Sequence, residues 1–324
     1  MFGPYLPPEL IAEVIIHVKS RHDLLQLMLL SENWRCEIER LLYTKVTITT
    51  KQKRRYQALT AEHLLKLCPR IGRIITSLNA WIVSMNCKSM KLILESVPNL
   101  RSLTMNFGFN YRSAPFHQYI PSSQPPFSLR IFSTDHQGSS DIDTFLRTQP
   151  CLEDIYLGTP TFKSWETLNS LGFANLLSLR TYSSRLAAVL LEAHTIERLH
   201  FLGDGHEMLE LVAEINGKTF PTVKALALNL SRDVGALVTA FPNVRSLQIF
   251  AVGRPMLHRY NVSSSFAPPE CTHSSTTTLR LEHSQTLKTY ISYIWVRYLT
   301  KGAPMTLKLH FHTERGTTSA TAQG

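Results

Sequence analysis

Cysteine is scarce and scattered in this 324-residue sequence, which contains five cysteines and no Cys-x-x-Cys pair. An odd number of widely spaced cysteines is typical of reduced thiols and excludes a disulfide framework as the expected basis of the fold. The first residues lack a basic stretch followed by an apolar one, and no apolar run reaches the roughly 18 residues that a membrane span needs. We therefore expect an intracellular protein, cytoplasmic, nuclear or both, with no membrane partner.

The sequence also lacks the short motifs that carry catalysis, because no GxSxG, HExxH or recognisable Cys/His pairing occurs in it. The stretch 217–219, Gly-Lys-Thr, matches the end of a phosphate-binding loop, but Val212 stands where that loop needs its first glycine. The histidines His194, His200 and His206 are spaced by six residues, and the repeat pattern described below does not bring them together. We expect no enzyme activity, no catalytic residues, no metal site and no cofactor.

Acidic residues are too few to balance the basic ones, and the imbalance is local. The net charge is +10, from 34 Lys and Arg against 24 Asp and Glu. Residues 45–73 hold eight Lys and Arg and one acidic residue, which gives this window a charge of +7. A solvated face is the ordinary interpretation, and a nuclear-import signal at 51–55 or a nucleic-acid surface are the alternatives. Because aromatic motifs of the RNA-binding kind are absent, nucleic acid is not the favoured partner.

Residues 6–43 predict three short helices. The first begins at Pro8, a good first-turn residue, and carries an apolar stripe to about Val18. The second begins at Asp23, as a plausible cap, and is apolar on nearly all sides through Leu30; the third follows Ser31 or Asn33. A helix that is apolar all round needs cover on more than one side, and about 40 residues rarely fold alone. We expect the rest of the chain or a partner protein to supply that cover.

The same segment resembles an F-box motif over about residues 4–46. Leu6, Pro7, Glu9, Ser31 and Trp34 occupy the places of the family pattern, and Leu30 stands where the family prefers valine. The resemblance implies docking on a Skp-type adaptor, and through it on a cullin. The residues expected in this helical module, some facing the adaptor and some its own core, are Leu6, Pro7, Leu10, Val14, Leu24, Leu25, Leu30 and Trp34. The alternative is a helical cap on a larger domain.

After residue 60, eight segments align on apolar residues at relative positions 0, +3 and about +5. The first positions, 20 to 29 residues apart, are Ile71, Leu100, Leu129, Leu152, Leu176, Ile196, Val223 and Val244, and a further copy begins at Leu287. Helix-start signals and prolines separate many of these segments, and the spacing lies in the leucine-rich-repeat range. The array resembles irregular leucine-rich repeats, in which each helix–turn–strand unit stacks on its neighbour.

The predicted fold class is therefore α/β: a three-helix F-box-like module followed by a leucine-rich-repeat-like solenoid with a parallel sheet. We expect the module at residues 4–46, the solenoid at 47–312 with protruding loops at 106–127 and 252–278, and a disordered tail at 313–324. The Asn/Cys ladder position of regular repeats is occupied by other residues, such as Gly108 and Ser184, so regular curvature is not expected.

Residues at +2, +4 and +6 should point out along the sheet, because side chains alternate along a strand. Tyr and Arg are enriched at binding hot spots. The expected target-binding residues are Tyr156, Arg180, Tyr182, Arg198, His200, Gln248 and Phe250, and the second candidates are the loop aromatics Phe109, Tyr111, Phe116 and Tyr119.

The predicted function is the substrate-receptor subunit of an SCF-type cullin–RING ubiquitin ligase, with an unknown protein substrate. The alternative is a non-catalytic leucine-rich-repeat scaffold for protein–protein interaction.

Overall fold

A computed structural model describes residues 6–49, 65, 68–82, 87–108, 111–112, 114–121, 124–136, 140–158, 172–203, 205–229, 239–252, 306–313 and 316–323. The chain divides into two compact units. The first comprises residues 1–152 with 160–162, and the second comprises 153–159 with 163–324. The basic stretch 51–55, the repeat copy at Leu287 and nearly all of the loop predicted at 252–278 lie outside the described residues.

The first unit begins with the three predicted helices, α1 (Pro8–His17), α2 (Arg21–Leu27) and α3 (Glu32–Tyr43). The cap of α2 is Ser20, whose hydroxyl accepts the backbone N–H of Asp23 at 3.3 Å, so Asp23 lies inside the helix and is not its cap. Ser31 caps α3 in the same way and accepts the N–H of Trp34 at 3.4 Å. Serine at these positions satisfies an N–H that the helix itself leaves without a partner.

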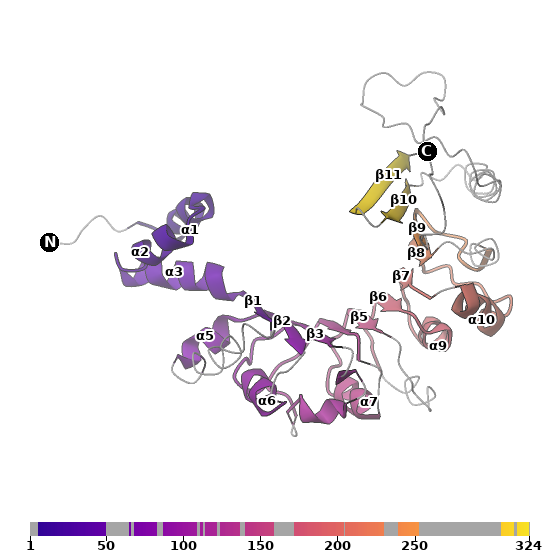
Figure 1. The fold of residues 1–324 in the computed structure, drawn as a ribbon, viewed down its shortest axis with the longest axis horizontal. Coiled ribbons are helices and arrows are strands. Elements are labelled where there is room, and N and C mark those ends of the chain that lie inside the picture. The colour runs from indigo at the N-terminus through magenta and orange to yellow at the C-terminus, as the bar shows by residue number, and fades with distance from the viewer. Residues whose placement is uncertain are drawn as a thin grey trace, which may run out of the picture. The chain divides into compact units, whose positions relative to one another are not determined.

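The parallel sheet of the first unit follows directly. Its strands are neighbours in chain order: β1 (Lys45–Thr49), β2 (Ser77–Ile82), β3 (Ser102–Phe107) and β4 (Ile131–Thr134). The helices of this sheet are α5 (Pro69–Ile74), α6 (Cys87–Glu95) and α7 (Ser140–Arg147), and a short 3-10 helix, η3, spans Phe116–Gln118. Figure 1 shows α5, α6 and α7 on the same side of these strands.

The second unit repeats the arrangement. Its parallel strands are β5 (Asp154–Leu157), β6 (Ser178–Thr181), β7 (Arg198–Phe201), β8 (Ala225–Asn229) and β9 (Ser246–Val252). Helix α9 (Ser184–Ala193) connects β6 to β7, and α10 (Gly205–Ile215) connects β7 to β8. Strand β10 (Thr306–Thr313) pairs parallel with β9, and β11 (Gly316–Gln323) pairs antiparallel with β10. The structure therefore places a strand in most of the stretch predicted as a disordered tail.

The strands stack through a recurring backbone contact. The N–H groups of Arg101 and Ser102 both donate to the carbonyl of Thr76, at 2.8 and 3.0 Å. In the second unit, the N–H groups of Glu197 and Arg198 donate in the same way to the carbonyl of Leu177, at 2.9 and 3.0 Å. The apolar residues at 0, +3 and +5 of β2, β3, β5, β7 and β8 are buried, and the described strands from β1 to β4 and from β5 to β10 pair in parallel, which confirms the predicted α/β class with a parallel sheet.

The phase of the first repeat differs from the prediction. Residues Pro69–Ile74 form α5, so Ile71 lies in a helix, and Ile75 takes the first repeat position. Leu78 of β2 pairs in register with Leu103 of β3, which fixes the shift at four residues. The isoleucines at 71, 74 and 75 satisfy both helical and strand periods, so the apolar pattern alone supports either phase.

The stretch 106–127 is not a protruding loop where the structure describes it. Phe116 is 0% exposed and Tyr119 is 4% exposed. The ring of Phe116 lies 5.9 Å from that of Phe145 and 5.4 Å from that of His136, and Tyr119 meets Phe107 edge-on at 5.2 Å. Both aromatics are thus core residues of the first unit and are no longer candidates for target binding. Tyr111 is half-buried, and Phe109 lies outside the described residues.

None of the helices in the described ranges is both long and apolar enough to cross a lipid bilayer.

Candidate functional site

The helical module, α1 to α3, leaves a large apolar surface uncovered. Its small core consists of Ile11, Ile15, Leu24 and Ile38. Outside that core, the described structure exposes seven large apolar side chains along and just after these helices, which we call the module's apolar surface: Leu10, Val14, Ile16, Leu25, Leu29, Leu30 and Leu41. Leu29 is 79% exposed and Leu10 is 53% exposed. Single exposed leucines are ordinary, but a concentration of them on about 35 residues is typical of an interaction surface.

The structure separates the eight predicted adaptor-binding residues into two groups. Leu24 lies in the module's core and Trp34 packs half-buried against that core, so both hold the helices together. The exposed group is Leu6, Pro7, Leu10, Val14, Leu25 and Leu30. Ile16, Leu29 and Leu41 also belong to the apolar surface and were not predicted. Ile16 lies off the stripe made by Ile11, Ile15 and Val18, and that helical phase is the signal that could have identified it.

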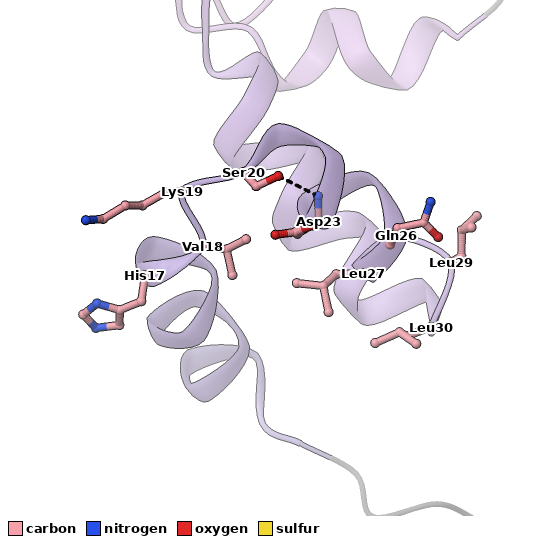
Figure 2. A pocket seen from close by; sticks show the side chains of 9 residues that line it. All are labelled: His17, Val18, Lys19, Ser20, Asp23, Gln26, Leu27, Leu29 and Leu30. Carbon is pink, nitrogen blue, oxygen red and sulfur yellow. Dashed lines mark hydrogen bonds between the residues drawn. The ribbon is translucent and has the colours of Figure 1, made fainter.

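A pocket of about 770 Å³ opens between the end of α1 and α2. Figure 2 shows Val18 and Leu27 pointing toward each other across it, whereas His17 and Lys19 point away. Leu30 borders the pocket, so the apolar surface continues into it. A second pocket, of about 680 Å³, is lined by residues of α1, α3 and α5, among them Ile16 and Leu41. The module therefore offers concave apolar sites as well as exposed side chains.

Hydrogen bonds connect the module to α5 and to the start of β2 in its own unit. Glu39 of α3 is 4% exposed and accepts a hydrogen bond from the Arg70 guanidinium of α5 at 2.6 Å. The carbonyl of Thr44 accepts the backbone N–H groups of Thr76 and Ser77, both at 3.0 Å. These contacts connect α3 to both the helix and the strand of the first described repeat.

The second candidate site is the sheet face of the second unit. In the parallel register, Tyr156 of β5 stands beside Arg180 of β6, which stands beside His200 of β7. The Arg180 guanidinium carbon lies 5.8 Å from the centre of the Tyr156 ring, within cation–π range. The row continues across β8 to the half-buried Gln248 of β9. Register thus brings together four of the seven predicted target-binding residues.

The other three lie nearby or cannot be assigned a side-chain position. Arg198 is exposed on β7, two residues before His200, and Tyr182 is half-buried immediately after β6. Phe250 pairs with Asn229 in the register of β8 and β9, and its side chain is not described.

His200 is neutral at physiological pH. Burial and, as the smaller cause, the positive charge of Arg180 together lower its pKa to about 4. The positive charges of this face therefore come from Arg180 and Arg198, with His200 as an uncharged neighbour.

The sheet face of the first unit carries two exposed apolar residues that were not predicted. Trp81 of β2 is 47% exposed, and Ile131 of β4 is 42% exposed. Beside Trp81 in the register stands Asn106 of β3, whose amide donates to the amide oxygen of Asn79 at 3.3 Å. The error in the first repeat's phase hid Trp81, because its outward position follows only when Ile75 is the repeat's first residue.

The described residues contain no group of three or more His, Cys, Asp or Glu side chains that could hold a metal ion. Of the three equally spaced histidines, His194 follows α9 and packs on Phe173, His200 lies on β7, and His206 lies on α10 beside Glu210.

The chain matches no protein-family model and no curated protein.

Proposed function

We propose that this chain is a substrate receptor: an F-box-like helical module that docks a Skp-type adaptor, followed by an irregular leucine-rich-repeat solenoid that holds a target protein. Through the adaptor it joins a cullin–RING ubiquitin ligase. The chain itself performs no chemistry in this proposal. It raises the effective concentration of the target near the ubiquitin carrier, as any bivalent connector does.

The observation that carries the proposal is the apolar surface of the module. Burying a fully exposed leucine side chain contributes about 1.5 to 3 kcal/mol. Leu29 and Leu30, on the turn after α2, and Leu10 and Val14, on α1, are exposed enough to gain much of this from a partner. The repeats contact α3 and the residue after it through Arg70 and Thr76, and they leave these four side chains exposed.

The second candidate function is a scaffold in which the helices only cap the end of the repeats. The ion pair between Glu39 and Arg70 and the backbone bonds to Thr44 favour it, because they are the contacts that a structural cap would make. A cap does not require Leu10 or Leu29 to be apolar, so substitution at these positions separates the two functions.

The experiment is capture of a purified Skp-type adaptor by the full chain and two variants. Leu10→Glu places a charge on the proposed docking surface at a residue that is 53% exposed. The matched control, Leu209→Glu, makes the same change on α10 at a residue that is 52% exposed. We expect wild type and the control to capture the adaptor and Leu10→Glu to lose at least tenfold in affinity.

Both variants should keep the wild-type circular dichroism spectrum, since neither side chain belongs to a core. If the folded wild-type chain fails to capture the adaptor, the receptor function is refuted and the scaffold remains. If Leu10→Glu and Leu209→Glu bind equally well, the docking surface has been placed wrongly.

A further inference from the structure

The sheet face of the second unit carries two arginines, Arg180 and Arg198, and one acidic residue, Asp154 of β5, which lies on the strand next to that of Arg180 and in the same register row as Arg198. Arg180 and Arg198 are both exposed, and among the described residues neither forms an ion pair with Asp or Glu. By contrast, Lys218 pairs with Glu192 at 2.6 Å, and Lys224 pairs with Glu197. Two lysines of this unit are thus paired with acidic side chains, whereas the two arginines of this face are not.

The surroundings of the two arginines favour recognition of a flat anion. The contact with Tyr156 restrains Arg180 without using its N–H groups as donors to an acceptor. A guanidinium can donate two parallel hydrogen bonds to one carboxylate, and such charge-assisted pairs are stronger than neutral ones. His200 beside Arg180 is uncharged, so it adds no repulsion to the arginine charge.

The spacing of the two arginines sets the distance between the two acidic side chains that they can bind together. Arg180 and Arg198 lie on adjacent strands, offset by two residues in the register, because Arg180 pairs with His200. Neighbouring strands are about 4.8 Å apart and each residue advances about 3.3 Å, so the two Cα atoms are roughly 8 Å apart. In an extended peptide, side chains at i and i+2 share one side and are about 6.6 Å apart.

The strand next to Arg198 carries small side chains on this face. Ala225 of β8 stands beside Arg198 in the register, and Ala227 stands beside His200. Alanine has the smallest side chain after glycine, so β8 adds little bulk beside Arg198, and Ala227 is 9% exposed between its neighbours on the face.

We propose that this face binds an extended segment of the target with acidic residues at i and i+2, and that Arg180 and Arg198 each take one carboxylate. The inference rests on the proposed function, since it names the class of target segment that the receptor holds. The partner is a protein segment rich in Asp or Glu, and its affinity comes from two bidentate ion pairs with arginines that form no ion pair with the Asp154 carboxylate of the same face.

The test uses the full chain and three labelled peptides in fluorescence anisotropy at low ionic strength. The first peptide carries Glu at i and i+2 in a Gly/Ser background, the second carries two adjacent Glu, and the third carries a single phosphoserine. All three carry a charge of about −2, so net charge alone does not distinguish them. We expect the i, i+2 peptide to bind at least threefold tighter than the other two.

The variants are Arg180→Gln and Arg198→Gln, with Arg185→Gln as the matched control. Arg185 is exposed on α9, so its substitution removes the same charge from the same unit without altering the sheet face. We expect each of the first two variants to lose about tenfold in affinity, because each removes one charge-assisted pair. We expect the control to change the affinity less than twofold. In the bound state the His200 pKa, followed by NMR, should rise, because a carboxylate now offsets the charge of Arg180.

Equal binding of the two Glu peptides would overturn the proposal, because the face would then respond only to charge. Tightest binding of the phosphoserine peptide would assign the face to a phosphate and overturn the carboxylate assignment. An equal loss in Arg185→Gln would show non-specific attraction to a basic protein. Peptide binding requires no adaptor, so its failure alongside successful adaptor capture refutes this inference and leaves the receptor function intact.

Discussion

Phe116 provides the sharpest test of how the first unit is built, because sequence alone places it in a loop and the structure places it in a core. Its side chain is fully buried, and four rings lie within 6.2 Å of its own: Phe107, Phe132, His136 and Phe145. Truncation of a buried phenylalanine to alanine costs about 3 to 5 kcal/mol. We expect Phe116→Ala to lower the free energy of unfolding of the first unit by an amount in this range.

The loss should appear first as local opening of residues 114–121. Polar contacts between this stretch and the rest of the unit include the hydrogen bond between His136 Nε2 and the carbonyl oxygen of Ala114, at 2.6 Å, and the contact of His117 Nδ1 with the Asp141 carboxylate, at 2.7 Å. A loss of about 3 kcal/mol raises the open population roughly 150-fold, and proteolysis of an opened segment follows that population when reclosing is fast. Limited proteolysis with mass spectrometry should therefore find cleavage within 114–121 about a hundredfold faster in Phe116→Ala.

The control is Gln118→Ala, because Gln118 is exposed on the same turn, η3, and should leave the cleavage rate unchanged. A less than threefold increase in Phe116→Ala would refute the reasoning. Rapid cleavage of the wild type at these sites would refute it as well, since it would mean that the aromatic cluster does not hold the segment.

Two further predictions concern backbone packing and pH. A Cβ built on Gly72 would lie 2.0 Å from the backbone carbonyl oxygen of Ser96, so Gly72→Ala should destabilise the first unit by at least the 1 to 3 kcal/mol typical of overpacking. Gly172→Ala, where nothing lies within 4 Å, should change the denaturation midpoint by little, and equal midpoints in the two variants would refute the close approach. His200 has a native pKa of about 4 and an ordinary value of 6.5, so its contribution to stability is complete above pH 6.5 and is lost as the pH falls toward 4. Its full size is at most about 3 kcal/mol, and urea titrations at pH 7 and 4.5 should show a smaller pH dependence in His200→Gln; an unchanged dependence would contradict the burial of this imidazole.

The repeats could be predicted from sequence because their signal is physical and local. Apolar residues at 0 and +3, and in most strands at +5, let each strand bury one face, and Leu100, Leu103 and Met105 show the pattern without ambiguity. The first repeat could not be placed because its isoleucines fit a helix and a strand equally well. In the structure Gly72 of α5 packs closely on the backbone of Ser96, and such a long-range contact leaves no periodic trace in the sequence.

The stretch 106–127 shows a second limit of prediction from sequence. Proline, serine and glycine between 106 and 127 are the ordinary marks of a loop, and the stretch has little regular secondary structure in the described residues. The stretch is buried because its rings contact residues that are distant in the sequence, such as Phe145 of α7, which contacts Phe116. Composition predicts the backbone of such a segment better than its burial.

For the helical module, sequence predicted the excess of apolar surface but not its location. On α2, Leu24 is 6% exposed and its neighbour Leu25 is 46% exposed, although the two residues are chemically identical. Which of them faces inward depends on where Ile11 and Ile38 lie, and an all-round apolar helix carries no phase to show it. The caps are more local, yet Ser20 and Asp23 are both good caps, and the structure was needed to choose between them.

The two proposed surfaces differ in chemistry, and this difference suits a connector. The apolar surface around Leu10 and Leu29 gains its free energy from removal of carbon from water, which salt does not screen. The pair of Arg180 and Arg198 gains its free energy from charge, and exposed charges are screened over about 8 Å at physiological ionic strength. A receptor of this design would hold its adaptor persistently and its target weakly. Such an asymmetry is what turnover requires, since the target must leave after modification while the adaptor stays bound.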